Sequence, residues 1–176
     1  MARIVLTAWG TYGDIFPALG IALALKARGH VAVVATCPYY RDLVTARGVE
    51  FAPLRPDINP DDLEFAARVM DPWRGAEVIF REGIMPALAD SLFDMRRAAE
   101  GADLIIAHPV SFTARMAAED ANIPWMSTVL SPISFFSAHD LPLPPGAPWM
   151  RHTRNWGLWW GRLFRAFAKK QTARWF

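Results

Sequence analysis

Cysteine is almost absent from this chain, and its scarcity excludes several kinds of protein. The only cysteine among the 176 residues is Cys37, so neither an internal disulfide nor a cysteine-based zinc site can form. We therefore expect a reducing, cytoplasmic environment. Long apolar runs are also lacking, since none approaches the roughly 18 residues that a membrane-spanning helix needs. The run Ile15–Leu25 follows a polar turn and has no basic leader, so we expect no signal peptide.

Acidic side chains are missing beyond Asp140. Residues 1–150 carry 12 basic and 17 acidic side chains, a net charge of −5, whereas residues 151–176 carry seven basic side chains and no acidic one. The overall charge of +2 therefore comes from the tail, and the body of the chain lacks the charge of a nucleic-acid-binding protein. With 53% hydrophobic and 20% charged residues, the chain is expected to fold around one sizeable core.

Short apolar runs alternate with helical patterns as far as Leu130. The expected strands are Arg3–Trp9, Val31–Thr36, Val49–Leu54, Leu104–Ala107 and Trp125–Leu130. The expected helices are Asp14 to Gly29, Tyr40–Arg47, one capped by Asp61 or Asp62 that runs to Met70, and Glu77–Ala99 with a disturbance at Gly83 and Pro86. A last helix is expected to be capped by Ser111 and to end at Ala121. This alternation predicts an α/β protein, a Rossmann-like domain whose parallel sheet is covered by helices on both faces.

The chain changes character after the fifth strand. Ser131–Pro148 is rich in proline and fits no regular element, and a loop of this length is often functional. Asn155–Phe176 has helical periodicity, with basic residues opposite an apolar stripe that consists of Trp156, Trp159, Trp160, Leu163, Phe164 and Phe167. We therefore expect a Rossmann-like domain over residues 1–150 and an amphipathic, Trp-rich helix within residues 151–176.

Three polar turns are expected to converge at one edge of the sheet. In an open parallel sheet, ligands bind outside the carboxyl ends of the strands, where the strand order reverses. With the usual order, the first strand brings Gly10–Asp14 to this edge, the fourth brings His108 and Pro109, and the fifth brings Leu130–Ser134. This convergence is the basis for a candidate site.

The glycine turn at Gly10–Asp14 lacks the features of two common nucleotide sites. A dinucleotide fingerprint needs a third glycine and an acidic residue at the end of the second strand, which here ends at Thr36 and Cys37. A phosphate-binding P-loop is absent as well, and Asp14 would repel a phosphate at this helix N-terminus. A dinucleotide oxidoreductase is therefore disfavoured.

Asp14 and His108 each have two interpretations. Aspartate is a favoured N-cap residue, so Asp14 could serve only to cap its helix or could act as a base. His108, at the end of a buried strand, could be a histidine bonded to local backbone or part of a site. The other histidines, His30, His139 and His152, match no metal-binding spacing, so we expect no metal site. Cys37 is interpreted as a small buried apolar residue.

The opening segment resembles a known family. Gly10-Thr-Tyr-Gly-Asp-Ile-Phe-Pro17 leads into an Ala/Leu-rich helix ending in Arg28-Gly29-His30, and it is similar to the N-terminal domain of GT-B glycosyltransferases. The resemblance is to the group of sterol glucosyltransferases and glycopeptide- and macrolide-modifying, UDP-glycosyltransferase-like enzymes. It continues through Ala35–Asp42, Arg47–Phe51, Asp103–Pro109 and Ile123–Pro132.

This resemblance implies one half of a two-domain GT-B architecture. In such enzymes the N-terminal domain holds the acceptor, and a second Rossmann-like domain holds the nucleotide-sugar donor as co-substrate, with no cofactor. The signature of that second domain does not occur in this sequence, so the chain is expected to be inactive by itself. Many relatives have the general base at the position of Asp14. Others have His there and an orienting Asp after the fourth strand. Asp14 and His108 are therefore expected to form a pair of reversed polarity that shares a proton, with either residue as the final base.

Further binding residues follow from the same resemblance. We expect Gly10, Thr11, Gly13 and Pro109 to contact substrate, and Ser131, Phe135 and Phe136 to line an apolar acceptor cavity. The aromatic residues of this loop could equally pack against the tail helix. The tail helix has three interpretations: packing on this or the second domain, a lid over the acceptor, or peripheral contact with an anionic membrane.

Two functions of different classes remain from the sequence. The leading hypothesis is the acceptor-binding half of an inverting, metal-independent glycosyltransferase, which moves a hexose from a nucleotide-sugar, expected to be a UDP-hexose, to a hydroxyl of a sterol, lipid or natural-product acceptor. The alternative is a non-catalytic Rossmann-like module that binds a small apolar ligand or a partner protein. Neither function involves nucleic acid.

Overall fold

A computed structural model describes residues 1–59, 61–131, 137–139 and 148–172, with the backbone alone at residues 154, 155, 171 and 172. Its internal contacts divide the chain into two compact units. One comprises Met1–Asp62 and Gly83–Thr128, and the other comprises Leu63–Glu82 and Val129–Phe176. This division differs from the two regions expected from the sequence, 1–150 and 151–176, because residues 63–82 and 129–150 group with the tail. The domain boundaries therefore stay a prediction.

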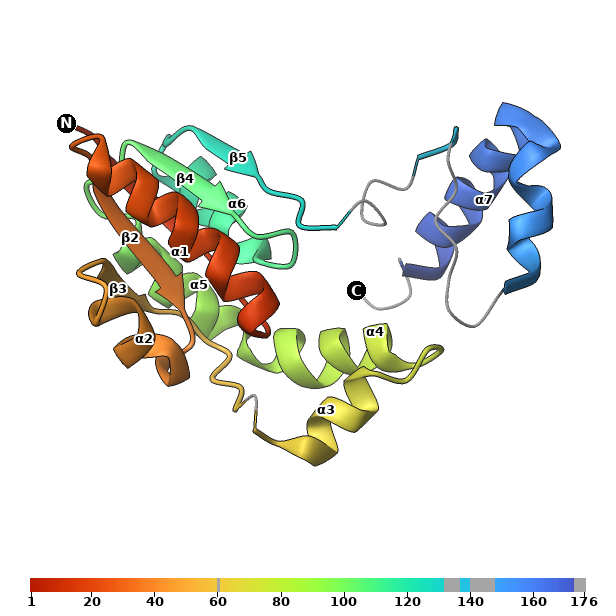
Figure 1. Ribbon diagram of the computed structural model, residues 1–176, viewed down its shortest axis with the longest axis horizontal. Helices are drawn as coiled ribbons and strands as arrows, with labels where there is room; N and C mark the ends of the chain where they lie inside the picture. The colour runs from red at the N-terminus through yellow and green to blue at the C-terminus, as the bar shows by residue number, and fades with distance from the viewer. Residues whose placement is uncertain (60, 132–136, 140–147, 173–176) are drawn as a thin grey trace. The chain divides into compact units, whose positions relative to one another are not determined.

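The first unit is built on a five-stranded, wholly parallel sheet in the order β3-β2-β1-β4-β5 (Figure 1). Its strands are β1 (Arg3–Thr7), β2 (Val31–Thr36), β3 (Glu50–Pro53), β4 (Leu104–Ala107) and β5 (Trp125–Ser127). In this order β2 and β3 lie on one side of β1, and β4 and β5 lie on the other side. The strand order therefore reverses between β1 and β4. The predicted Rossmann-like α/β fold and the predicted position of the reversal are confirmed.

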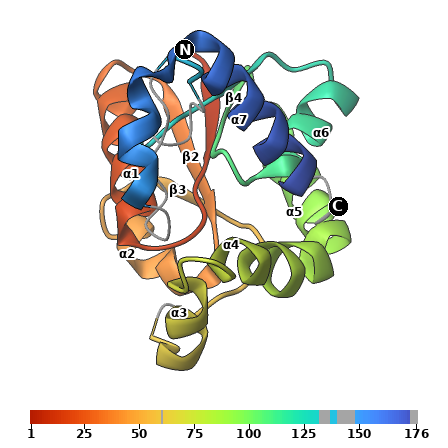
Figure 2. The ribbon, with the colours of Figure 1, turned by 90° about the vertical axis from the view of Figure 1, so that its right-hand side faces the viewer.

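Alternating side chains of the strands build a core on each face of the sheet. Val5 of β1 and Ile105 of β4 point to the face covered by α5 (Leu88–Ala98) and α6 (Phe112–Asp120). Leu6 of β1 and Ile106 of β4 point to the opposite face, where they pack with α1 (Tyr12–Ala27) and α2 (Arg41–Thr45). Figure 2 shows the two pairs of helices on either side of the strands. Near-continuous apolar strands are what burial on both faces requires.

The first helix begins and ends with well-formed caps. At its start, Thr11 and Asp14 form a capping box. The Thr11 hydroxyl accepts a hydrogen bond from the Gly13 amide, and the Asp14 carboxylate accepts one from the Thr11 amide. At its end, the amide of Gly29 donates to the carbonyl of Lys26 and the amide of His30 donates to that of Leu25, the two bonds of a Schellman motif. Gly29 has φ +82, a left-handed conformation that favours glycine, as the sequence predicted.

Two strands are shorter than expected. β1 ends at Thr7 rather than Trp9, because Gly10 takes φ +125 and turns the chain towards α1. β5 ends at Ser127 rather than Leu130. Both the amide and the hydroxyl of Thr128 donate to the carbonyl of Ala107, at 2.8 and 3.1 Å, and the strand pairing stops there.

The long helix expected over Glu77–Ala99 is interrupted where the sequence indicated. After α4 (Gly75–Val78) the chain forms a π-helical turn, η2 (Ile79–Ile84), then a 3-10 turn, η3 (Met85–Ala87), before α5 begins. Pro86 lies in the 3-10 turn, where its missing amide breaks the α-helical bonding. Ser111 occupies the N-cap position of α6, but its side chain makes no capping hydrogen bond, so that part of the expectation is wrong.

Among the described residues, one short 3-10 segment of the first unit and the helices of the second unit remain. η1 (Pro38–Tyr40) precedes α2, and α3 (Leu63–Val69) lies beside α4. In the tail, η5 (Pro148–Trp156) leads into α7 (Gly157–Thr172), so the helix expected from Asn155 begins at Gly157. Within the described residues, no helix has both the length and the apolar character needed to cross a bilayer.

Two glycines of α1 give a matched test of its C-terminal cap. An added Cβ would meet nothing within 4 Å at either Gly20, in the helix, or Gly29, after it. We expect Gly20→Ala to raise the free energy of unfolding by about 0.5–1 kcal/mol, because alanine loses less backbone entropy in a helix. Gly29→Ala should lower it by about 1–2 kcal/mol, because alanine resists the left-handed conformation. Chemical denaturation of the two variants measures both, and equal signs would contradict this account of the cap.

Candidate active site at the carboxyl edge of β1 and β4

Asp14 and His108 meet at the edge of the sheet where the strand order reverses. The Oδ1 atom of Asp14 lies 3.2 Å from the Nε2 atom of His108, although the two residues are 94 positions apart in the sequence. Asp14 comes from the first turn of α1 and His108 from the residue directly after β4. Their side chains are 28% and 10% exposed, respectively, so the pair is half-buried and Asp14 is its more accessible member.

The carboxylate of Asp14 has two separate tasks. Its Oδ2 atom accepts hydrogen bonds from the Thr11 amide at 2.8 Å and from the Thr11 hydroxyl at 3.3 Å, which completes the capping box. Its Oδ1 atom faces His108. The capping interpretation and the contact with His108 are therefore both correct, and each uses its own oxygen atom.

Gly10 is required for this arrangement. Its φ of +125 disfavours any other residue, and a Cβ at this position would collide with the Oδ2 atom of Asp14. The buried phenol of Tyr40 donates a hydrogen bond to the Gly10 carbonyl at 3.1 Å, which ties the turn to the segment after β2. Gly13 donates its amide to the Thr11 hydroxyl at 3.3 Å. The predicted residues Gly10, Thr11 and Gly13 thus shape the turn that holds Asp14.

His108 is held on two sides by backbone contacts. Its amide donates to the hydroxyl of Thr7, at the end of β1, over 2.8 Å. Its Nδ1 atom lies 3.5 Å from the amide of Val110, which donates to it. With Nδ1 as an acceptor, a neutral ring carries its proton on Nε2, and Nε2–H then donates to Asp14. Pro109 follows His108 directly and leads the chain away from the strand end.

The environment of Asp14 shifts its pKa downwards. Burial raises the pKa of this carboxyl, but the hydrogen bonds from His108 and from the Thr11 backbone together outweigh the effect of burial. The pKa of Asp14 therefore lies below its ordinary value. At neutral pH the residue is a carboxylate that can accept a proton.

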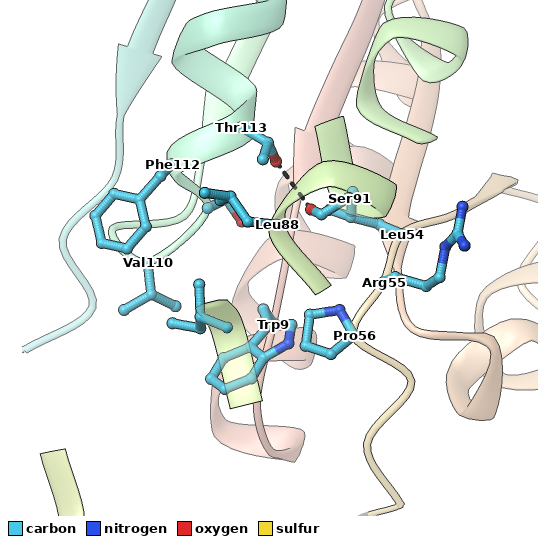
Figure 3. A pocket seen from close by; sticks show the side chains of 11 residues that line it. Trp9, Leu54, Arg55, Pro56, Leu88, Ser91, Val110, Phe112 and Thr113 are labelled. Atoms are coloured by element: carbon cyan, nitrogen blue, oxygen red, sulfur yellow. Dashed lines mark hydrogen bonds between the residues drawn. The ribbon is translucent and has the colours of Figure 1, made fainter. Parts of the chain in front are cut away.

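A small pocket lies at the same carboxyl edge of the sheet. It is lined by residues that follow strand ends, namely Trp9, Leu54, Arg55, Pro56 and Val110–Thr113, and by side chains of η2 and α5, namely Ile84, Leu88 and Ser91 (Figure 3). Trp9 directly precedes Gly10, and Val110 is two residues beyond His108. The lining is mostly apolar, and the hydroxyls of Ser91 and Thr113 bond to each other over 3.0 Å.

Sequence reasoning missed most of this pocket. Trp9, Leu88 and Val110 are apolar and resemble ordinary core residues, so their types give no signal. Their positions do give one, since Trp9 and Val110 lie just beyond the ends of β1 and β4, where the polar residues were expected. A rule that considers every residue after these strand ends, apolar ones included, would have found Trp9 and Val110.

The expected contribution of the fifth strand is not tested, because Leu130 belongs to the second compact unit and residues 132–134 lie outside the described residues. Ser131 is exposed and belongs to the second compact unit. Phe135 and Phe136 lie outside the described residues. Their role in acceptor binding stays a prediction, while the convergence of the first and fourth strand ends is confirmed. Among the described residues, no group of three His, Cys, Asp or Glu side chains could hold a metal ion.

The parallel sheet, its order and the polar pair at its switch point define a Rossmann-like domain. The chain belongs to the family described as the glycosyltransferase family 28 N-terminal domain, whose model matches residues 4–135. The resemblance read from the opening motif is therefore confirmed.

Curated relatives are glycosyltransferases of both expected kinds. The chain is 29% identical to O-mycaminosyltylonolide 6-deoxyallosyltransferase of Streptomyces fradiae, over 71% of this chain and 30% of that protein. It is 31% identical to L-demethylnoviosyl transferase of Streptomyces niveus, over 70% of this chain and 33% of that protein. It is 26% identical to sterol 3-beta-glucosyltransferase of Cryptococcus neoformans, over 74% of this chain and 8% of that protein. The chain thus spans a third or less of the length of these relatives.

Solved structures agree on the fold. The glycosyltransferase SsfS6 of Streptomyces sp. SF2575 matches with a TM-score of 0.56 and 23% identity, over 72% of this chain and 39% of that chain. SnogD of Streptomyces nogalater matches with a TM-score of 0.52 and 22% identity, over 76% of this chain and 35% of that chain. Both are glycosyltransferases, and at this identity the match establishes the fold alone.

The lowered pKa of Asp14 predicts a pH-dependent contribution to stability. Its ionisation stabilises the fold fully above the unfolded pKa of about 3.9, and this contribution is lost as the pH falls through the lower folded value. The stability difference between the wild type and Asp14→Asn should therefore be larger at neutral pH than in acid. Denaturation curves recorded from acid to neutral pH measure this stability difference. In a second experiment, NMR titration of His108→Ala should give a higher pKa for Asp14 than in the wild type. A constant difference and an unchanged pKa would contradict the contact.

Proposed function

We propose that this chain is the acceptor-binding part of an inverting glycosyltransferase. In this proposal the whole enzyme transfers a hexose from a nucleoside-diphosphate sugar to a hydroxyl group of an apolar acceptor. The observation that carries the proposal is the contact between Asp14 and His108 at the switch point of the sheet, 3.2 Å from Oδ1 to Nε2. Such a carboxylate beside a pocket can take the proton of an acceptor hydroxyl.

In the proposed reaction, Asp14 is the general base and His108 is a positioning residue. As the acceptor oxygen forms its bond to the anomeric carbon, its proton passes to the Asp14 carboxylate. The bond from the anomeric carbon to the diphosphate breaks at the same time, and the nucleoside diphosphate leaves with the bonding electrons. Attack from the face opposite the leaving group inverts the anomeric carbon. No resident cofactor takes part, since the donor is a co-substrate.

Three observations favour Asp14 over His108 as the base. Asp14 is the more exposed of the two, 28% against 10%. With Nδ1 accepting from the Val110 amide over 3.5 Å, a neutral His108 ring carries its proton on Nε2 and donates it to Asp14. The carboxylate keeps unused lone pairs even while it bonds to Thr11 and His108. His108 then fixes the orientation of the carboxylate.

The neighbouring pocket supports an apolar acceptor. Its walls come from Trp9, Leu88, Val110 and other mostly uncharged side chains, while Arg55 is engaged by Asp90 and Asp94 at 2.9 and 2.7 Å. An acceptor that entered the pocket from the side of Gly10 would reach the pair with a hydroxyl at its end. An apolar body with few polar anchor points is the usual partner of such a lining.

Binding of the donor is proposed to lie largely outside this chain. The relatives are about three or more times as long as the segment that matches. The turn at Gly10–Asp14 presents a carboxylate where a phosphate-binding helix N-terminus would present amides only. We therefore expect the acceptor to bind to this chain and the nucleoside diphosphate to bind to the remainder of the enzyme.

Replacement of Asp14 in the whole enzyme separates a base from a cap. Asparagine caps helices nearly as well as aspartate but cannot take a proton. We expect Asp14→Asn to lower kcat by roughly two to four powers of ten with the acceptor KM nearly unchanged. His108→Ala should lower kcat by less, and the double variant should be no slower than Asp14→Asn, because the two residues act as a unit.

The control for this experiment is Asp71→Asn. Asp71 accepts hydrogen bonds from the amides of Trp73 and Arg74 at 2.8 and 2.7 Å, so it too is a carboxylate bonded to nearby backbone, and neither of these partners is a histidine. This variant should keep the wild-type kcat. If Asp14→Asn were as active as Asp71→Asn, Asp14 would be a structural cap, and a binding module would be the better description of the chain.

A larger side chain in the pocket should weaken acceptor binding. We expect Val110→Trp to raise the acceptor KM about tenfold or more by filling the pocket, with a smaller effect on kcat. Leu23→Trp, on the exposed side of α1, is the control and should change neither constant. Steady-state kinetics of the whole enzyme with saturating donor measures both. An unchanged KM in Val110→Trp would place the acceptor elsewhere.

A further inference from the structure

The apolar stripe expected on the tail helix is divided between two sides of α7. Trp160 and Phe164 are partly buried, and Gly161 between them is buried against the segment 137–139. A Cβ at Gly161 would collide with the carbonyl of Ala138, so the helix backbone itself is in contact there. This inner side packs within the second compact unit, as one of the sequence interpretations expected.

The other half of the stripe is exposed. Trp159, Leu163 and Phe167 follow one another at intervals of four residues and therefore lie along one line of the helix. Trp159 is 71% exposed and Phe167 is 57% exposed, and Trp156 before the helix is also largely exposed. Large aromatic side chains are rarely left in water in such a row, and an exposed row of this kind indicates contact with another phase or molecule.

Basic side chains accompany this exposed row. Arg162, Arg165 and Lys169 form a neighbouring row at intervals of three and four residues, and Lys170 continues the apolar row one turn beyond Phe167. All four side chains are exposed, and no acidic residue occurs anywhere between Leu141 and Phe176. The surface therefore offers apolar rings and positive charge together.

We propose that the outer side of α7 binds the surface of an anionic lipid bilayer. The helix lies in the plane of the interface, with Trp159, Leu163 and Phe167 among the upper acyl chains. The arginine and lysine side chains pair with the lipid phosphates. Tryptophan suits this depth because its ring is apolar while its indole N–H can reach a polar partner. The helix attaches to the membrane without crossing it, which agrees with its length and charge.

Charge favours a lipid surface over a second copy of the chain. In a symmetric dimer the same surface meets itself, so the rows of Arg162, Arg165 and Lys169 would face one another across the contact. Like charges at such a contact cost several kcal/mol, and no acidic side chain in this part of the sequence would relieve them. A bilayer instead presents many phosphates to the same charges.

The test is co-sedimentation of the 176-residue chain with vesicles. Vesicles of phosphatidylcholine alone are compared with vesicles that contain about 30 mol% phosphatidylglycerol. We expect at least tenfold stronger partitioning onto the anionic vesicles. The pair Trp159→Ala with Phe167→Ala should reduce it about tenfold or more. The pair Arg162→Gln with Arg165→Gln should reduce it about 25-fold, given about fivefold for each of the two basic residues near the surface.

Matched controls exclude general effects of the substitutions. Trp73 is 71% exposed, as is Trp159, but lies in a different part of the chain, so Trp73→Ala should leave binding unchanged. Arg28→Gln with Arg74→Gln removes two exposed charges outside α7 and should also have no effect. Circular dichroism melting of each variant shows whether α7 still folds. The arginine pair remains informative if the aromatic pair does not fold.

Three outcomes would overturn the proposal. The first is equal partitioning onto neutral and anionic vesicles, and the second is an equal loss in the control variants. The third is a dimer in solution that the aromatic pair of substitutions dissociates, which would make the surface a contact between copies. Because the measurement does not involve catalysis, its failure leaves the proposed role of Asp14 untouched, and the reverse also holds.

Discussion

The geometry of the site depends on one carboxylate with two bonded oxygens. Asp14 Oδ2 completes the first turn of α1 through Thr11, and Oδ1 reaches His108 at the end of β4. The side chain therefore connects a helix that packs on one face of the sheet with a strand in its centre. Gly10 makes this connection sterically feasible, and Tyr40 holds the Gly10 carbonyl in place. Because the same residue starts the helix and faces the histidine, the orientation of the proposed base is fixed by the fold itself.

The central strands and the paired residues could be predicted because their causes are local. Val31–Thr36 and Leu104–Ala107 are bounded by turn residues and buried on both faces, so their predicted and observed limits coincide. The usual strand order predicted that the turns after strands one and four meet at the switch point, and the family resemblance predicted that Asp14 and His108 pair there. No knowledge of side-chain positions was needed for either result.

The features that the sequence could not predict depend on packing between distant segments. β5 ends at Ser127 because its neighbour β4 ends at Ala107, which the periodicity of the fifth strand does not reveal. The pocket beside the site is formed by apolar residues from several elements, among them Trp9 and Leu88, which become neighbours only in the folded chain. The division of the α7 stripe likewise required the position of Ala138, which presses on Gly161.

The two outer strands of the sheet bear on how the chain behaves at high concentration. An unpaired strand edge is a template for adding strands from other molecules, and long, flat, apolar edges promote aggregation. Here β5 has only three residues and β3 has four, with Pro53, which has no amide to donate, at its end. Neither edge can pair over more than a few residues with a neighbouring chain. The sheet thus places its most apolar strands in the centre and leaves short, easily terminated ones outside, which protects the chain from β-aggregation while it folds.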